Sequence, residues 1–459
     1  MPLALSLYSA LLRLARPLLR RKLARRAVQE PAYGQDVAQR FGDYRELPPY
    51  QPHPEMPLVW VHAVSLGETR AAAILVRELR EQIPALRLLL THGTATGREE
   101  GRKLLLPGDI QVWQPWDDAG AVRSFLRRFR PAIGILMETE MWPGLVAGCR
   151  ARGIPLMLVN ARLNAKSHRG ARQLGWLSRP AYGALASVLA QTESDAVRLR
   201  DLGAPVQAVL GNLKFDVHVD EPLLARGRAW RELQSRPVVL LASSREGEEG
   251  LWLEALKQKM ALAQAQQAQS AIKKEASNVQ WLVVPRHPQR FDEVQALLAG
   301  AGLTVSRRSQ WGDAPEAADV WLGDSMGEMH LYYGMAHAAL LGGSFAPLGG
   351  QNLIEAAACG CPVVMGPHTF NFAQAAEASI EAGAALRAAD MADGVAQAVQ
   401  LAGDPLRQQA MARAATVFAA SHRGAARATA QLVAAELEKT EGFVNSCFGT
   451  DESLNRFQN

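Results

Sequence analysis

Residues 336–372 read AHAALLGGSFAPLGGQNLIEAAACGCPVVMGPHTFNF, and the organisation of the rest of the chain follows from this stretch. A short apolar run at 338–341 predicts a buried strand, and the glycines after it predict a tight loop. Asn352 is expected to open an Ala-rich helix. Unpaired backbone N–H groups and the positive end of a helix dipole are expected to converge at such a junction, and glycine lets a phosphate approach the backbone. The stretch therefore predicts an anion site.

Glu355 lies one turn into the predicted helix. A carboxylate repels phosphate at close range but accepts hydrogen bonds from ribose hydroxyls, so its presence favours a nucleotide over bare phosphate. An ordinary strand-to-helix turn, in which Asn352 and Glu355 only cap the helix, accounts for the same residues equally well. The sequence is not the G-x-G-x-x-G dinucleotide fingerprint, so that inference does not apply.

Length and composition predict a folded chain of two domains. It has 459 residues, of which 48% are apolar, enough for two cores of ordinary size. The formal charge of +5 is too small to indicate nucleic acid, and it is concentrated in residues 1–30, which carry seven basic side chains and one acid. The four cysteines lack the spacing of a zinc site, which fits a reducing cytoplasm.

Residues 3–26 predict a basic amphipathic helix. Leucines at 7, 11, 14 and 18 share one stripe, and arginines at 13, 16 and 20 lie roughly opposite. The uncharged part is shorter than the ~20 residues of a transmembrane helix, and no signal-peptidase pattern follows. We therefore expect an interfacial anchor on an anionic leaflet. The alternative is a helix that packs on its own domain.

Strand-like and helix-like segments alternate from residue 55 to 212 and again from 237 onward, which predicts two βα domains of α/β class. The expected division is a membrane-associating helix at 1–30, an N-terminal Rossmann-like domain at 31–216, a C-terminal Rossmann-like domain at 217–440 and a polar tail at 441–459. Within the second domain, the Ala/Gln/Lys-rich stretch 257–276 is expected to be a solvated arm.

Glu68 is the best candidate for a general base. It follows the predicted strand 58–64 on the loop to a helix, at the edge where open α/β sheets build their sites. A partly desolvated carboxylate there can accept a proton from a substrate hydroxyl. The alternative is a carboxylate that only complements the helix dipole. Glu138 and Glu140 follow the strand 133–137, whereas His62 is expected to be a core histidine.

Three further sites each have two possible explanations: a role in ligand binding, or a purely structural or solvent-exposed position. Arg286 suits a phosphate or a sugar carboxylate, or is a surface arginine. The segment 326–328 offers a backbone amide to a base or phosphate, or is a helix N-terminus. Lys214, at the junction of the halves, faces a cleft or solvent. No convincing metal-binding pattern accompanies them, so we expect metal-independent chemistry without a cofactor.

Together, these features suggest transfer of a group from a nucleotide to a membrane-borne acceptor. The residues also resemble those of the 3-deoxy-D-manno-octulosonic acid (Kdo) transferases, from the N-terminal helix to about residue 430. The resemblance rests on the ordered motifs His62–Glu68 (HAVSLGE), Met137–Pro143 (METEMWP), Asn160–Leu163 (NARL), Gly211–Asp216 (GNLKFD), Val284–Pro288 (VPRHP), Gly323–Glu328 (GDSMGE), Gly342–Phe345 (GGSF) and Met365–Phe372 (MGPHTFNF).

The resemblance implies a GT-B glycosyltransferase, with its two domains facing across a cleft. It would move Kdo from CMP-Kdo to a lipid A precursor (lipid IVA), with inversion, at the cytoplasmic face of the inner membrane. By position, Glu68 matches the family's proton acceptor, with Glu138 nearby in the acceptor-binding domain. The residues that match the CMP-binding segments are Pro285, Arg286, Met326, Gly327, Glu328, Asn352, Leu353, Ile354 and Glu355.

The chain departs from the family's pattern at three places. Gln351 replaces a usual His, Ser244-Arg245 replaces a common Thr-His, and Gln39 replaces a usual Glu. The first two are expected to border the CMP site. Two other functions remain open: a nucleotide-sugar epimerase of the same fold, and a membrane-associated nucleotide-sugar binder without catalysis. Glu68 separates the binder from an enzyme, because a binder does not need a base aimed at an acceptor.

Overall fold

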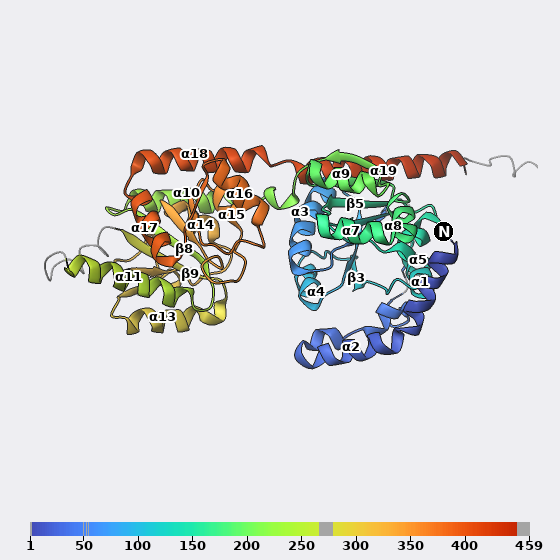
Figure 1. Cartoon of the computed structure of the whole chain (residues 1–459), viewed down its shortest axis with the longest axis horizontal. Helices are drawn as coiled ribbons and strands as arrows, with labels where there is room; N and C mark the ends of the chain where they lie inside the picture. The colour runs from blue at the N-terminus through green and yellow to red at the C-terminus, as the bar shows by residue number, and fades with distance from the viewer. Residues whose placement is uncertain (1, 49, 52, 54, 266–278, 448–459) are drawn as a thin grey trace, which may run out of the picture. The chain divides into compact units, whose positions relative to one another are not determined.

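The computed structural model describes residues 2–48, 50, 51, 53, 55–265 and 279–447 (Figure 1). The chain divides into two compact units, one of Met1–Asp216 with Arg423–Asn459 and the other of Val217–His422. Within the described residues, each unit is built on a seven-stranded parallel sheet. The two predicted βα domains are thus confirmed as Rossmann-like folds. Residues 266–276 of the predicted arm and 448–459 of the predicted tail lie outside the described residues.

The sheet of unit 1 has the strand order β3-β2-β1-β4-β5-β6-β7. Alternate residues of β1 point to opposite faces, so Trp60 packs in one core and Val61 in the other. The order reverses between β1 and β4, where open α/β sheets place their sites. The strands are β1 (Leu58–His62), β2 (Arg87–His92), β3 (Ile110–Trp113), β4 (Ile133–Met137), β5 (Leu156–Ala161), β6 (Ser187–Ala190) and β7 (Val206–Val209).

The sheet of unit 2 has the order β10-β11-β9-β8-β12-β13-β14 and reverses between β8 and β12. Its central strands are fully buried, as expected of a parallel sheet covered on both faces. The strands are β8 (Val238–Ser244), β9 (Gln280–Pro285), β10 (Val305–Arg307), β11 (Val320–Leu322), β12 (Ala338–Leu341), β13 (Val363–Met365) and β14 (Ala385–Arg387).

Helices cover both faces of each sheet (Figure 1). Those of unit 1 are α1 (Pro2–Leu14), α2 (Arg16–Gln29), α3 (Leu66–Gln82), α4 (Ala95–Arg102), α5 (Ala119–Phe129), α6 (Pro143–Arg150), α7 (Ala165–Gln173), α8 (Gly175–Tyr182), α9 (Glu193–Asp201) and α19 (Ala425–Cys447). Those of unit 2 are α10 (Glu221–Glu232), α11 (Glu248–Ala265), α13 (Phe291–Gly300), α14 (Met329–Met335), α15 (Leu353–Ala358), α16 (Ala373–Glu381), α17 (Met391–Ala402) and α18 (Pro405–Ser421).

The last helix belongs to unit 1, although the sequence analysis assigns residues up to 440 to the C-terminal domain. The reason is an apolar stripe on α19, in which Ala430, Val433 and Leu437 are buried in the same core as Leu75 of α3. The carboxylate of Asp216 also accepts hydrogen bonds from the backbone N–H groups at the start of this helix. The chain therefore leaves unit 1 at residue 216 and returns to it at 423.

The N-terminal segment forms two helices, α1 and α2, which meet at Ala15. One face contacts unit 1: the Arg16 guanidinium pairs with Asp118 at 2.8 Å, and Leu23 is buried. The predicted leucine stripe is largely exposed, with Leu7 59%, Leu14 78% and Leu18 70% exposed. The helix thus packs on its own domain and still presents an apolar face to solvent. Among the described residues, no helix is long and apolar enough to cross a membrane.

Candidate active site

Three carboxylates follow the two strands that flank the reversal point of unit 1. Glu68 lies in the first turn of α3, after β1, and Glu138 and Glu140 lie between β4 and α6. Since β1 and β4 are hydrogen-bonded neighbours, both connections emerge at the same carboxyl edge. The structure therefore brings together the two sequence-predicted catalytic residues and adds Glu140 to them.

Glu68 is held by the start of its own helix. Ser65 caps α3, its hydroxyl accepting from the Glu68 N–H at 3.4 Å and donating to Glu68 Oε1 at 3.0 Å. The Val64 N–H donates to Oε2 at 2.8 Å. This resembles a capping box, except that the carboxylate accepts from the N–H of the residue before the cap, so the ordinary structural role of Glu68 is present. A carboxylate can accept about four hydrogen bonds, which leaves capacity for a substrate hydroxyl.

The surroundings of Glu68 favour its protonated form more than water does. Burial raises the pKa of Glu68, and the negative charge of Glu138 raises it further. The hydrogen bond from Val64 and the positive charge of Lys214 act in the opposite direction. A carboxylate with a raised pKa is a stronger base than an ordinary one, which is what proton abstraction at neutral pH requires.

Glu138 is a buried carboxylate on an unusual backbone. Its φ of 57° lies in the left-handed region, and its side chain is 8% exposed. Oε1 lies 3.2 Å from Lys214 Nζ, and Oε2 lies 3.7 Å from an Arg162 guanidinium nitrogen. These cations offset the cost of burying the charge. The pairing gives Lys214, which the sequence left as either cleft-facing or solvated, a defined place beside the carboxylates.

Glu140 is the site residue that sequence reasoning noticed without giving it a role. Burial raises its pKa to about 7, and the nearby negative charge of Glu68 contributes to the rise. Each of these two carboxylates therefore disfavours the ionised form of the other. The available signal was the METE motif, which places carboxylates at both 138 and 140.

His62 and Gln39 have structural roles. His62 is fully buried in β1, its Nδ1 lies 2.9 Å from the hydroxyl of Thr91, and burial lowers its pKa to about 3, so it is neutral. The prediction of a core histidine is therefore confirmed. The side-chain oxygen of Gln39 accepts from the Trp113 N–H at 3.0 Å, which ties the segment after α2 to β3.

In unit 2, a buried carboxylate binds part of the glycine loop that the sequence predicted to hold an anion. Glu248 is fully buried and accepts hydrogen bonds from the N–H groups of Gly343, Arg245, Phe345 and Ala346 at 2.6 to 3.3 Å. The prediction that amides of this glycine loop are unpaired is wrong at these positions, because Glu248 carries the negative charge that they bind. The part of the predicted anion site that Glu248 does not occupy is the first turn of α15.

That first turn is arranged as expected for a capped helix. The Asn352 side chain accepts from the Ile354 N–H at 3.1 Å, and Leu353 and Ile354 are buried. Glu355 is half-buried, and its Oε1 lies 3.4 Å from His330 Nε2. His330 lies on α14, the helix after β11, and Glu355 lies on α15, the helix after β12. This contact therefore joins the two helices.

The remaining predicted donor residues lie on neighbouring loops of the same sheet edge. The Arg286 N–H donates to the Ser244 carbonyl at 2.9 Å, which joins the loops after β9 and β8. Gly327 has a φ of 82°, a conformation that favours glycine, and Met326 is 62% exposed. The Glu328 carboxylate is engaged by an Arg308 guanidinium at 2.8 Å.

Two of the departures from the family's pattern lie together. A Cβ added at Gly343 would be 3.1 Å from the side-chain nitrogen of Gln351 and 3.6 Å from Cγ of Arg245. Both side chains therefore flank the same glycine at the carboxyl edge of the sheet.

As for metals, the described part of the chain holds no group of three or more His, Cys, Asp or Glu side chains that could bind an ion.

Comparison with known proteins relates the chain to one family. Residues 35–217 match the family model described as 3-deoxy-D-manno-octulosonic-acid transferase (kdotransferase). The 3-deoxy-D-manno-octulosonic acid transferase of Bordetella pertussis is 50% identical over 384 residues, which cover 82% of this chain and 87% of that protein. The transferase of the same name from Haemophilus influenzae is 33% identical over 400 residues, or 86% and 89% of the two chains.

Comparison with solved structures concerns the fold alone. UDP-GlcNAc 2-epimerase from Neisseria meningitidis, bound to UDP-GlcNAc, aligns with a TM-score of 0.52 and 16% sequence identity. The alignment covers 84% of this chain and 100% of that one. Two Rossmann-like domains in one chain, each with a parallel sheet, are the GT-B class that the sequence predicted.

Proposed function

The chain belongs to the 3-deoxy-D-manno-octulosonic acid (Kdo) transferase family and is thus a glycosyltransferase of lipopolysaccharide biosynthesis. We propose that its donor is CMP-Kdo, that its acceptor is a lipid A precursor and that Glu68 is its general base. The observation that carries the assignment of the base is the environment of Glu68. Its carboxylate is fixed by Ser65 and Val64, and burial and Glu138 raise its pKa.

The proposed reaction is a direct displacement at the anomeric carbon of Kdo. A glucosamine hydroxyl of the acceptor gives its proton to Glu68 as its oxygen forms the new bond to that carbon. The bond from the anomeric carbon to the CMP phosphate oxygen breaks, and CMP leaves with the electron pair. One displacement from the opposite face inverts the configuration. General-base catalysis of this kind contributes about 10²- to 10⁴-fold to the rate.

Glu138 and Lys214 are proposed to support this step rather than to take the proton. The Glu138 carboxylate is already paired with Lys214, which keeps its negative charge in place beside Glu68. That charge disfavours the ionised form of Glu68 and so increases its basicity. The cation of Lys214 is also available to a carboxylate such as that of Kdo.

The donor is proposed to bind at the carboxyl edge of the unit 2 sheet. Arg286 and the first turn of α15 would hold the phosphate, and Glu355 would accept hydrogen bonds from the ribose. The exposed backbone at Met326-Gly327 would face the base. The proposal uses no metal ion, because the guanidinium and the backbone N–H groups supply the positive charge that the departing phosphate requires.

We place the acceptor's membrane at the leucine stripe of α1 and α2. Leu3, Leu7, Leu11, Leu14 and Leu18 are each more than half exposed, and basic side chains accompany them along the same helices. An apolar stripe with arginines is the pattern of a helix that lies in the interface of an anionic bilayer. The proposed site is the cytoplasmic face of the inner membrane, where the lipid acceptor would be drawn from the bilayer.

The test is transfer by purified protein. Wild type and Glu68→Gln are incubated with CMP-Kdo, generated in situ, and a tetraacylated lipid A precursor in detergent, with and without chelator, and the lipid mass is followed. We expect the wild type to add one or more Kdo units in both conditions and the variant to lose at least about 100-fold in rate. A wild type that binds CMP but adds no Kdo would overturn the proposal.

Two matched measurements make the result specific to the base. Asn164→Ala removes the cap of another helix of unit 1, α7, where the Asn164 side chain accepts from the Ser167 N–H at 2.8 Å, and is expected to cost about 1 kcal/mol of stability with only a small loss of rate. Thermal unfolding of both variants shows whether either has lost its fold. The epimerase alternative is not favoured, because the relatives at 50% and 33% identity are transferases, whereas the epimerase shares only the fold.

A further inference from the structure

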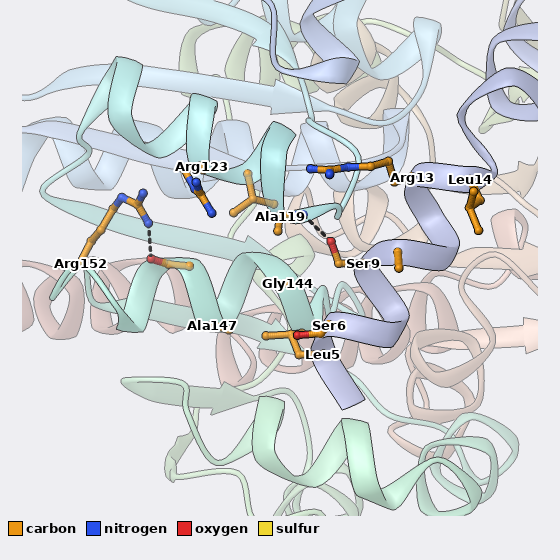
Figure 2. Close-up of a pocket in the computed structure, with 13 residues that line it drawn as sticks. Leu5, Ser6, Ser9, Arg13, Leu14, Ala119, Arg123, Gly144, Ala147 and Arg152 are labelled. Carbon is orange, nitrogen blue, oxygen red and sulfur yellow. Dashed lines mark hydrogen bonds between the residues drawn. The ribbon is translucent and has the colours of Figure 1, made fainter. Parts of the chain in front are cut away.

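A pocket of about 620 Å³ lies within unit 1 between α1 and the α5–α6 side of the sheet (Figure 2). Its volume is in the ordinary range of about 300–1,000 Å³ for small-molecule sites. The walls are largely apolar, with Leu5, Ala10 and Leu14 from α1, and Val122 and Ala147 from α5 and α6. None of the residues given a role in the transfer step lines it, so the pocket needs a separate explanation.

Three guanidinium groups also line the pocket. They belong to Arg13 of α1, Arg123 of α5 and Arg152 in the turn after α6. Figure 2 shows Arg13 extending toward the segment at Ala119. Arg152 donates to a carbonyl at 3.2 Å, whereas Arg13 and Arg123 form no ion pair with any described residue. Apolar walls with unpaired cations are complementary to a molecule that has both an acyl chain and a phosphate.

The residues at the two ends of the pocket show which surfaces of unit 1 it adjoins. Leu14 lines the pocket and is also part of the exposed leucine stripe, so the pocket opens beside the proposed membrane-facing surface. Ala119 and Gly144 line it from the first turns of α5 and α6, and these helices follow β3 and β4. This part of the pocket therefore lies at the same carboxyl edge of the sheet as Glu140, and Leu14 lies at its exposed side.

The walls of the pocket are fixed rather than loosely apposed. The Asp117 carboxylate accepts from the N–H groups of Gly144 and Leu145 at 2.8 and 2.6 Å, which holds the start of α6. On the opposite wall, the Ala119 N–H donates to the Ser9 hydroxyl at 2.8 Å, which holds α1 against α5 (Figure 2). A pocket with walls pinned on both sides is organised before a ligand arrives.

We propose that this pocket is an acceptor subsite, in which an acyl chain of the lipid acceptor lies along the apolar walls and one of its phosphates binds Arg13 and Arg123. This inference rests on the proposed function, since it names the part of the acceptor that unit 1 recognises away from the transfer step. A bulk phospholipid has related chemistry, but the position of the pocket at the carboxyl edge of the sheet, the edge that carries Glu140 and Glu68, favours the acceptor.

The apolar half of the proposal is tested by filling the pocket. Ala147→Leu adds bulk to a lining residue, and Ala151→Leu makes the same change just past the end of α6, outside the pocket. We expect Ala147→Leu to raise the KM for a tetraacylated lipid A precursor about tenfold, with kcat and the KM for CMP-Kdo unchanged. Equal KM values for the two variants would overturn the inference.

The charged half is tested with acceptors that carry or lack a phosphate. The wild type is expected to prefer the phosphorylated acceptor by about tenfold in kcat/KM, as a charge-assisted contact of this strength implies. Arg13→Gln with Arg123→Gln should remove the preference, whereas Arg150→Gln, on α6 but outside the pocket, should keep it. A preference that survives the double substitution would contradict the phosphate assignment.

Two results distinguish failure of this inference from failure of the proposed function and from binding of bulk phospholipid. If the wild type itself transfers no Kdo, the proposed function fails first, and the comparison of variants does not arise. If the wild type is active but Ala147→Leu weakens binding to phosphatidylethanolamine–phosphatidylglycerol vesicles as much as it raises the acceptor KM, the pocket takes bulk phospholipid and the acceptor subsite is wrong. We expect vesicle binding to be unchanged, because Ala147 is not part of the leucine stripe.

Discussion

Lys214 Nζ lies 3.2 Å from Glu138 Oε1, so the cation at the end of the first segment of unit 1 is paired with the buried carboxylate that follows β4. The two residues are far apart in sequence; Glu138 has a left-handed backbone, and its N–H donates to the Val159 carbonyl of β5 at 3.0 Å. The pair controls the charge around Glu68, because Glu138 raises the pKa of Glu68 and Lys214 lowers it.

Lys214→Met should therefore shift the acid limb of the pH–rate profile. Removal of the cation leaves the charge of Glu138 less compensated, so the pKa of Glu68 rises and its base form is lost at a higher pH. We expect the acid limb of kcat/KM to move upward and the rate at neutral pH to fall. The measurement is kcat/KM between pH 4.5 and 8.5, with Lys166→Met, an exposed lysine of α7, as the control. A shift to lower pH would contradict the assignment.

Asp117 predicts a pH dependence of stability. Burial raises its pKa to about 7, against about 3.9 for an unfolded chain. The folded protein therefore binds this proton more tightly, and the stabilisation is complete below about pH 4 and is lost as the pH rises through about 7. Asp117→Asn removes this titration, so the free energy of unfolding should fall less between pH 5 and 8, by about 1 kcal/mol or more.

The check is urea unfolding at several pH values. Glu99→Gln, at an exposed position of α4, should keep the wild-type dependence on pH. If Asp117→Asn and the wild type lose stability in parallel over this range, the proton is not held at Asp117.

Glu248→Gln should destabilise the loop after β12. The carboxylate accepts from Gly343, Arg245 and two further backbone N–H groups, and an amide can present only one oxygen to them. Leaving buried donors unpaired costs about 1–3 kcal/mol each, so we expect a loss of at least about 2 kcal/mol and weaker CMP binding. Thermal unfolding and calorimetry measure the two effects. Glu246→Gln, which changes an exposed partner of Arg245, is the matched control and should alter neither.

The leucine stripe should mediate vesicle binding. Replacing Leu7, Leu11 and Leu14 by Ser removes apolar surface that would enter the interface, so sedimentation with anionic vesicles should weaken at least about tenfold. The stability should change little, because these side chains are exposed in the folded chain. The control is the same triple change at Leu233, Leu251 and Leu406, which are exposed in unit 2. Equal vesicle binding by the two triple variants would remove the stripe as the membrane contact.

Most strands of both sheets could be predicted from sequence because parallel strands are buried on both faces and appear as short apolar runs. Two were missed: β10 (Val305–Arg307) and β14 (Ala385–Arg387) have three residues each and include half-exposed arginines, so they leave little hydrophobic signal. The position of α19 was also missed, since an Ala-rich amphipathic helix carries no information about which core it joins.

At the site, sequence reasoning found Glu68 and Glu138 because both follow strands of the sheet edge. It could not find the role of Glu248, since a glutamate at a helix start is usually exposed, and only the fold brings it against the amides of Gly343 and Phe345. The pKa of Glu140 was equally out of reach, because it depends on burial and on the charge of Glu68, which are properties of the assembled edge.

The return of the chain to unit 1 at residue 423 has a consequence for synthesis. Residues 1–216 leave the ribosome first, but the face of α3 that packs against α19 stays uncovered until Val433 and Leu437 of α19 have been made. At about 5–20 residues per second, that delay lasts on the order of ten seconds or more. During this delay, the incomplete protein exposes an apolar helix face that can associate with other chains. A premature stop codon anywhere before α19 would leave that face permanently exposed.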